Sequence, residues 1–205
     1  DNSSEKEQHF LIDGGGGNRI LKVLKDTGIA LEDIHDIFVT HEHVDHILGI
    51  IWLIRMIGQR MNQGKYTSDL RIYCHAELAE KIQAIANMTI QQKVCKHMGE
   101  RIQFDIIENG SERKILDCPV TFFDIGSTKA KQFGFTMTLN NGKKFTCVGD
   151  EPYNTINYEF VKDSDWLLHE AFCLYSEADK FKPYEKHHST VREACQLAEE
   201  LGVPN

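Results

Sequence analysis

The segment that most constrains this chain is residues 41–46, which read His-Glu-His-Val-Asp-His. It directly follows residues 36–40, Asp-Ile-Phe-Val-Thr, whose three central apolar residues predict a buried strand. Imidazole nitrogens and carboxylate oxygens are ligands that Zn²⁺, Mn²⁺ and Fe ions accept in proteins. A solvated polar loop rarely holds so many of them at this spacing, so we predict a metal site here. Its candidate ligands are His41, His43, Asp45 and His46.

Three other segments place acids or histidines where a strand ends or a helix begins. Residues 147–150 end at Asp150, residues 167–170 end at His169-Glu170, and His188 lies just before the last predicted helix. Each has an ordinary explanation, because a Gly-Asp turn often caps a helix and a His-His pair is usually on the surface. Together they favour one active site at one edge of a sheet, where loops carry function.

The remaining chain alternates predicted strands with predicted helices, so its fold class is α/β or α+β. The Asn140-Asn141-Gly142 segment predicts a hairpin turn. Ser189 or Thr190 is the expected N-cap of the last helix, with Glu193 placed for a capping box. Strands are expected at residues 10–12, 36–40, 70–74, 101–107, 120–125, 133–139, 144–148 and 165–168. Helices are expected near residues 20–24, 47–60, 75–86 and 190–201.

Length and composition indicate one domain, residues 1–205, in a cytoplasmic protein. No apolar stretch approaches the ~20 residues that span a bilayer, and no membrane partner is expected. The six cysteines include no Cys-x-x-Cys pair, and we interpret them as reduced thiols.

The four motifs, taken in order, resemble the metallo-β-lactamase superfamily and, within it, the tRNase Z (ribonuclease Z-like) branch. Residues 41–46 match the HxHxDH signature in full, and Gly149-Asp150 matches the bridging-aspartate motif. Residues 169–172 match the HEAT box in part, and residues 188–190 match the HST box. The resemblance implies an αββα sandwich, in which two β-sheets are flanked by helices. That fold would lack its first and last strands here, so we expect the native protein to extend in both directions.

The resemblance also implies a centre of two metal ions. The first ion would be held by His41 and His43. The second would be held by Asp45, His46 and His188, and Asp150 would bridge both. Zinc is the expected cofactor, with one or two ions per chain, and Mn²⁺ or Fe stays open. The implied ligand set is His41, His43, Asp45, His46, Asp150 and His188.

In the reaction that the resemblance implies, a metal-bound hydroxide attacks the phosphorus of a phosphodiester. His169 would donate a proton to the leaving oxygen, and Glu170 would orient His169. We therefore count Asp45, His169 and Glu170 as catalytic residues.

One expected ligand is missing, because residues 122–135 contain no histidine where the family has a third one for the first metal. Our alignment places Gly126 there, with Ser127 or Thr128 as the alternatives. Three accounts are open. The first and preferred one is that Gly126 is a natural or engineered substitution that lowers activity. The second is that the protein works with one metal at the second site, and the third is that another histidine replaces the missing ligand. His75 and His97 are the candidates for the last account.

The substrate is less constrained than the chemistry. Residues 58–99 hold no Gly/Pro-rich arm of the kind that tRNase Z uses to grip tRNA, and the net charge of −8 argues against a broad nucleic-acid groove. A phosphodiester substrate is expected, with RNA and smaller phosphodiesters both open, and a homodimer is open too. The rivals are a thioester, lactone or β-lactam hydrolase and a catalytically impaired metal-binding member.

Overall fold

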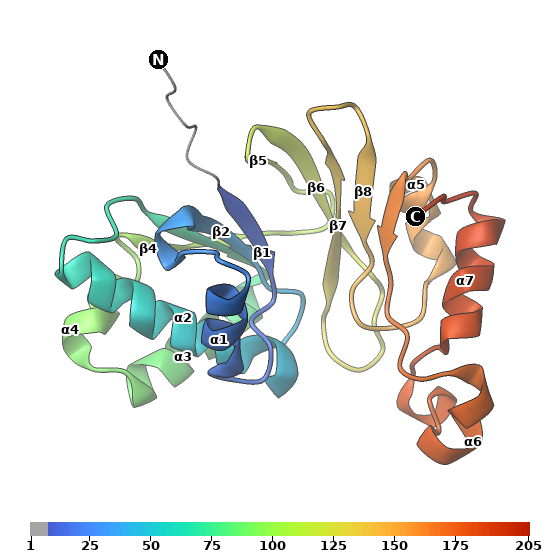
Figure 1. Ribbon diagram of the computed structural model, residues 1–205, viewed down its shortest axis with the longest axis horizontal. Helices are drawn as coiled ribbons and strands as arrows, with labels where there is room; N and C mark the ends of the chain where they lie inside the picture. Colours follow the sequence, from blue (N-terminus) through green and yellow to red (C-terminus); the bar gives the residue numbers. More distant parts are fainter. Residues whose placement is uncertain (1–7) are drawn as a thin grey trace. The chain divides into compact units, whose positions relative to one another are not determined.

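The computed structural model describes residues 8–205, and the chain falls into two compact units, Asp1–Ile107 and Glu108–Asn205. Each unit is built on its own β-sheet, with helices beside it (Figure 1). The expected fold class is confirmed, because two sheets flanked by helices make up the chain. The expectation of a single domain that lacks its first and last strands stays a prediction.

The first unit contains a four-stranded sheet in which all neighbouring strands are parallel. Ile34, Ile37 and Phe38 of one inner strand are fully buried, as is usual for parallel sheets covered by helices. Because the strands run the same way, their carboxyl ends share one edge of the sheet. The strands, in spatial order, are β1 (His9–Ile12), β2 (Ile34–Phe38), β3 (Leu70–Cys74) and β4 (Ile102–Ile106).

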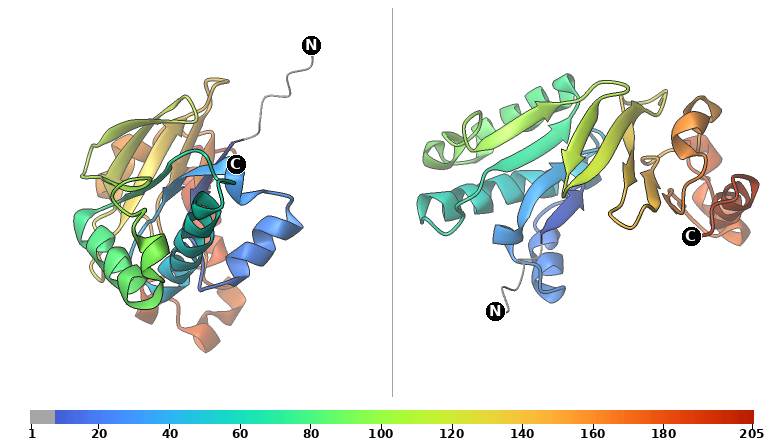
Figure 2. Two further views of the ribbon diagram at one scale, coloured as in Figure 1. Left: turned by 90° about the vertical axis from the view of Figure 1, so that its left-hand side faces the viewer. Right: turned by 90° about the horizontal axis from the view of Figure 1, so that it is seen from above.

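Helices of this unit cover one face of the sheet (Figures 1 and 2). The longest contributes Ile50, Leu53, Ile54 and Ile57 to the core, at the spacing that puts apolar side chains on one face of a helix. The helices of the unit are α1 (Arg19–Asp26), α2 (Val44–Asn62), α3 (Ala76–Thr89) and α4 (Gln92–Cys95).

A glycine turn, residues 14–17, joins β1 to α1 and packs against the beginning of α2. The Gly14 N–H donates to the carbonyl of His46 over 2.8 Å, and the Gly49 N–H donates to the carbonyl of Gly15 over 2.9 Å. A Cβ atom on Gly14 would lie 2.4 Å from the backbone nitrogen of Ile50. Only glycine therefore allows the turn to support the helix end that carries the metal motif.

We expect the Gly14→Ala substitution to lower the free energy of unfolding by about 1–3 kcal/mol, the usual cost of overpacking. The matched control is Gly16→Ala, because a Cβ there would meet only the Asp45 Cα at 3.7 Å, an ordinary contact. Urea denaturation of both variants measures the difference. Equal stability of the two would contradict the close approach of the turn to α2.

The second unit contains a five-stranded sheet, antiparallel except for one parallel pair between its last two strands. Two of its strands form the expected hairpin, where Gly142 has the positive φ of 79° that such turns require. The strands, in spatial order, are β5 (Glu112–Ile115), β6 (Cys118–Asp124), β7 (Phe133–Thr138), β8 (Lys144–Cys147) and β9 (Trp166–Leu168).

The helices of the second unit are short, and the last of them packs beside β9 (Figure 1). Phe160 stacks on Phe123 of the sheet with ring centroids 4.6 Å apart, and Leu201 joins the same cluster. The last helix begins with the expected capping box of Thr190 and Glu193. The helices are α5 (Tyr158–Val161), α6 (Ala178–Phe181) and α7 (Val191–Glu200).

Most of the expected elements are present within two or three residues of their predicted ends. Strand β5 and the short helices α4, α5 and α6 were not predicted, because segments of about four residues leave too little periodicity to detect. Among residues 8–205, no helix combines the length and the apolar character that crossing a membrane requires.

Candidate metal centre

The first unit gathers the four residues of its motif where β2 ends and α2 begins. His41 is fully buried, and its Nε2 atom lies 2.8 Å from Nδ1 of His43. His43 is the N-cap of α2 in an extended conformation. The Asp45 carboxylate lies 3.7 Å from Nε2 of His46. These two distances bring ligand atoms of the motif close together within the first unit.

Asp13, which the sequence reasoning missed, fixes the imidazoles of this motif. The Nδ1–H of His46 donates to the Asp13 carboxylate over 2.7 Å. The Thr40 hydroxyl donates to the same carboxylate over 2.8 Å, and the Thr40 N–H does so as well. Because the hydroxyl proton is used in this way, the Thr40 oxygen accepts from Nδ1 of His41 over 2.9 Å.

This network places the lone pair of two imidazole rings on Nε2, the nitrogen through which each ring would bind a metal. Both His41 and His46 carry their proton on Nδ1, since each donates there to an oxygen acceptor. The Nε2 lone pair of His41 faces His43 at 2.8 Å, a distance at which the two nitrogens must share a proton or a cation. The donor set therefore fits the divalent metal that the motif predicts, and the half-buried carboxylate of Asp13 supports it.

We expect Asp13→Asn to weaken zinc binding by about 10–100-fold, the usual cost of losing a group that orients a ligand. The amide NH₂ of asparagine can donate to Nδ1 of His46. That donor would favour the tautomer with its proton on Nε2, which has no lone pair there for a metal. Competition with a fluorescent chelator measures the affinity. Asp26→Asn is the control, because Asp26 is exposed and pairs with Lys22. Unchanged zinc affinity in Asp13→Asn would rule out this role.

The second unit brings its candidates to one edge of its sheet. β8 and β9 are parallel neighbours, with Cys147 opposite Leu168, so the residues after them leave the sheet at the same edge. Asp150 follows β8, and His169 and Glu170 follow β9. The side chain of Gln132, which is buried, accepts a hydrogen bond from the Asp150 N–H. A structural amide therefore fixes the backbone of the expected bridging aspartate.

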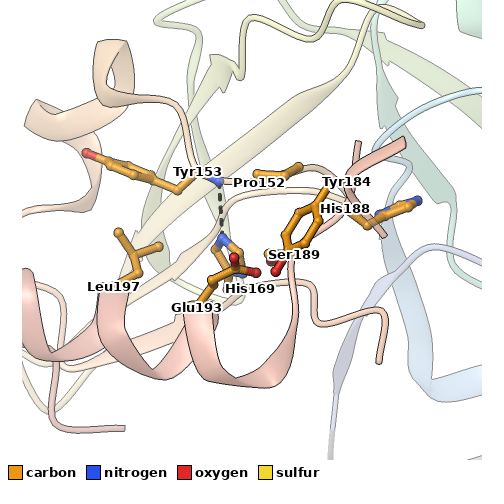
Figure 3. Close-up of a pocket in the computed structure, with 8 residues that line it drawn as sticks. All are labelled: Pro152, Tyr153, His169, Tyr184, His188, Ser189, Glu193 and Leu197. Carbon is orange, nitrogen blue, oxygen red and sulfur yellow. Dashed lines mark hydrogen bonds between the residues drawn. The ribbon is translucent and has the colours of Figure 1, made fainter. Parts of the chain in front are cut away.

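A pocket of about 280 Å³ in this unit contains two of the predicted residues, His169 and His188 (Figure 3). Nδ1 of His169 donates to the carbonyl of Glu170 over 2.6 Å, and its Nε2 accepts from the Tyr153 N–H over 3.2 Å. Both ring nitrogens are thus engaged by the backbone. The pocket is lined by Pro152, Tyr153, His169, Tyr184, His188, Ser189, Glu193 and Leu197.

The Glu170 carboxylate has other partners than the one expected from the motif. It accepts hydrogen bonds from the N–H and the hydroxyl of Ser189, and it lies 3.4 Å from Nδ1 of His188. The atom of Glu170 that contacts His169 is its backbone carbonyl oxygen. Among the described residues, the structure therefore shows no hydrogen bond between the Glu170 carboxylate and His169.

Gly126, where the family histidine is missing, lies in a turn with a positive φ of 74°. A Cβ atom there would lie 2.6 Å from the end of the Ile156 side chain and 3.0 Å from the Asn154 amide nitrogen. The neighbouring Ser127 hydroxyl donates to Glu151 over 2.6 Å. A histidine at position 126 therefore requires these side chains to move and the backbone to change or bear strain.

The two histidines proposed as replacements have structural contacts of their own. His75 follows β3 and its Nδ1 accepts the Leu78 N–H as the N-cap of α3. His97 pairs with Asn62 over 3.0 Å at the last residue of α2, about 27 Å along the helix from the ligands at its start. Burial lowers the pKa of the His97 imidazole, which favours its neutral form. Helix length thus argues against His97 as a replacement ligand.

We expect the chain to hold less than two equivalents of zinc after purification, because the first metal lacks one imidazole. Gly126→His is expected to raise the zinc content while lowering the free energy of unfolding by about 1–2 kcal/mol, the cost of a side chain at a left-handed φ. Gly64→His is the control, since it has a φ of 69° and open space around it. Elemental analysis gives the zinc content. Two tightly held equivalents in the unaltered chain would contradict the expectation.

Comparison with known proteins identifies the family of this chain. Residues 3–202 match the family of the anti-Pycsar protein Apyc1. The ribonuclease Z of Clostridioides difficile (strain 630) is 37% identical over 242 residues, which cover 94% of this chain and 75% of that protein. The ribonuclease Z of Archaeoglobus fulgidus is 25% identical over 241 residues, covering 96% of this chain and 75% of that protein.

Solved structures agree on the fold. Human tRNase Z, short form, superposes with a TM-score of 0.72 at 20% identity and covers 96% of this chain and 78% of that chain. The metallo-β-lactamase fold protein YhfI from Bacillus subtilis gives a TM-score of 0.70 at 18% identity, covering 96% and 71%. With its fold, its HxHxDH motif and these relatives, the chain belongs to the anti-Pycsar protein Apyc1 family, in the tRNase Z-like branch of the metallo-β-lactamase superfamily.

Proposed function

We propose that this protein hydrolyses phosphodiester bonds in a reaction that depends on divalent metal. The observation that carries the proposal is the hydrogen-bond network of Asp13 and Thr40, which holds the Nδ1 protons of His41 and His46 and so directs a metal to Nε2 of each ring. The ribonuclease Z relatives support a phosphodiester as the bond that is cleaved.

The ligands follow the motif assignments. His41 and His43 would hold the first metal, Asp45, His46 and His188 the second, and Asp150 would bridge the two. When bound, divalent metals acidify water and neutralise the charge of phosphate oxygens. We propose zinc as the metal because imidazole and carboxylate ligands suit it, with Mn²⁺ or Fe as the alternatives.

We propose His169 as the group that gives a proton to the leaving oxygen, since it lines the pocket beside His188. In the present arrangement its Nε2 accepts the Tyr153 N–H, so this hydrogen bond must open before Nε2 can carry a proton to the substrate. Binding of a substrate in the pocket would displace the Tyr153 backbone. Glu170 keeps a place in the site, but as a partner of His188 rather than of His169.

A small phosphodiester is the substrate class that we favour. The pocket volume of about 280 Å³ is at the low end for ligand sites. Pro152, Tyr153 and Leu197 give it an apolar wall, and the net charge of −8 provides no broad basic groove. RNA is the second candidate, which the ribonuclease Z relatives support.

Turnover of bis-(p-nitrophenyl) phosphate beside a panel of thioesters, lactones and β-lactams tests the proposed function. We expect zinc-dependent release of nitrophenol from the phosphodiester and none of comparable rate from the panel. Activity on the panel alone would overturn the choice of bond. Absence of both activities in the metal-loaded chain would favour the rival account, in which the protein binds metal but does not catalyse hydrolysis.

We also propose the cytoplasm as the location of the protein. All six cysteines lie in the described part of the chain and are free thiols, four of them buried. Reduced thiols are typical of compartments that keep glutathione and thioredoxin reduced. Thiol titration of protein isolated from cells under acid quench would show six free groups if this is right.

A further inference from the structure

Glu170 is a buried carboxylate whose surroundings are defined by the second unit alone. Its side chain is 6% exposed. One carboxylate oxygen, Oε1, accepts both the N–H and the hydroxyl of Ser189, each over 2.5 Å. That oxygen is therefore saturated, and the orientation of the carboxylate is fixed by the residue that follows His188 in the chain.

The other oxygen, Oε2, faces the imidazole of His188. It lies 3.4 Å from Nδ1, which is buried and makes no hydrogen bond to any residue of the part that the structure describes. The ring of His188 is stacked on Phe172, with centroids 4.9 Å apart and planes 9° from parallel. The stack holds the plane of the ring, so a small rotation of either side chain would close a charge-assisted hydrogen bond from Nδ1–H to Glu170.

From these contacts we infer that Glu170 is a positioning residue for His188 and does not act on the substrate. Its carboxylate accepts the Nδ1 proton and thereby keeps the lone pair of His188 on Nε2, the nitrogen available to a metal. The inference rests on the proposed function, in which His188 is a ligand of the second metal. It gives this histidine a carboxylate partner at Nδ1, as Asp13 is for His46.

Glu170→Gln is the most informative variant, because glutamine has nearly the same shape as glutamate but carries a hydrogen-bond donor in place of one acceptor oxygen. The amide oxygen would keep the two hydrogen bonds from Ser189, so the amide NH₂ would face Nδ1 of His188. A donor there favours the tautomer with its proton on Nε2, which has no lone pair for metal. Glu185→Gln is the matched control, since it removes the same charge from an exposed site three residues before His188.

Two measurements test the inference. Two-bond ¹H–¹⁵N spectra of the metal-free protein report the tautomer of His188, whose signals are identified by their loss in His188→Gln. We expect Nδ1–H in the unaltered chain and in Glu185→Gln, and Nε2–H in Glu170→Gln. Competition with a chelator should show zinc affinity reduced about 10–100-fold in Glu170→Gln and unchanged in Glu185→Gln.

The same His188 tautomer in the unaltered chain and in Glu170→Gln, with equal zinc affinity, would overturn the inference. If Glu170→Gln fails to fold, Ser189→Ala replaces it: freeing Oε1 should weaken zinc binding, and equal affinity would again overturn the inference. The tautomer is read without metal, so it still tests Glu170 if the unaltered chain proves to have no metal-dependent activity. A lack of metal-dependent activity in the unaltered chain would refute the proposed function but not the role of Glu170.

Discussion

Replacing Asp150 with asparagine is expected to lower the rate of phosphodiester hydrolysis by about 10³-fold. The Asp150 carboxylate would supply negative charge to the metals that it is proposed to hold, and the neutral amide would not. Loss of metal-based stabilisation of the transition state is worth several kcal/mol, and each 1.36 kcal/mol is tenfold in rate. The variant should fold, because the backbone N–H of residue 150 keeps its partner in Gln132. Initial rates on bis-(p-nitrophenyl) phosphate at saturating zinc measure the effect.

Asp163→Asn is the matched control for this variant. It removes the same charge from an exposed residue of the same unit, and asparagine tolerates its φ of 60°. The control should retain the rate of the unaltered chain. A rate within threefold of the unaltered chain in Asp150→Asn would mean that residue 150 does not serve the metals.

The second large effect concerns stability. Ile54→Ala should lower the free energy of unfolding by about 2–5 kcal/mol, since the substitution leaves a cavity in the core of the first unit. Ile54 is 0% exposed and lies among the residues of α2 that pack against the sheet. Urea denaturation measures the loss, and Met88→Ala, at a side chain 77% exposed, is the control that should change little.

Zinc affinity separates this stability effect from a direct effect on the site. Ile54 lies about two turns of α2 beyond His46, so the folded variant should bind zinc as the unaltered chain does. A loss of stability below 0.5 kcal/mol in Ile54→Ala would contradict the assignment of this helix face to the core.

Much of the local structure was predictable because the sequence carries periodic signals for it. The strand at residues 70–74 was located from its apolar residues, and the capping box of Thr190 and Glu193 from its spacing. The metal motif was predictable for a similar reason, since its four ligand types are adjacent in the chain. Strand β5 escaped detection because Glu112, Arg113 and Lys114 are all charged and hide the period of a strand.

The supporting groups of the site were not predictable, because they depend on which strands become neighbours. Asp13 is an ordinary acid at the end of a short strand until β1 pairs with β2 in parallel and places it beside Thr40. Its position at the end of an apolar strand, followed by a glycine turn, was the available signal. The carboxylate of Glu170 was expected on His169, its neighbour in the chain, but the course of residues 170–189 brings it to Ser189 and His188 instead.

The central claim is that histidines and acids from distant parts of the chain bind the same divalent cations. Crystals of the zinc-loaded protein, measured at the zinc absorption edge, test it directly through the anomalous difference map. We expect peaks about 2.0–2.2 Å from the imidazoles of His41, His46 and His188 and from the carboxylate of Asp150. Peaks that involve none of these side chains, or no peak in protein that hydrolyses phosphodiesters, would contradict the claim.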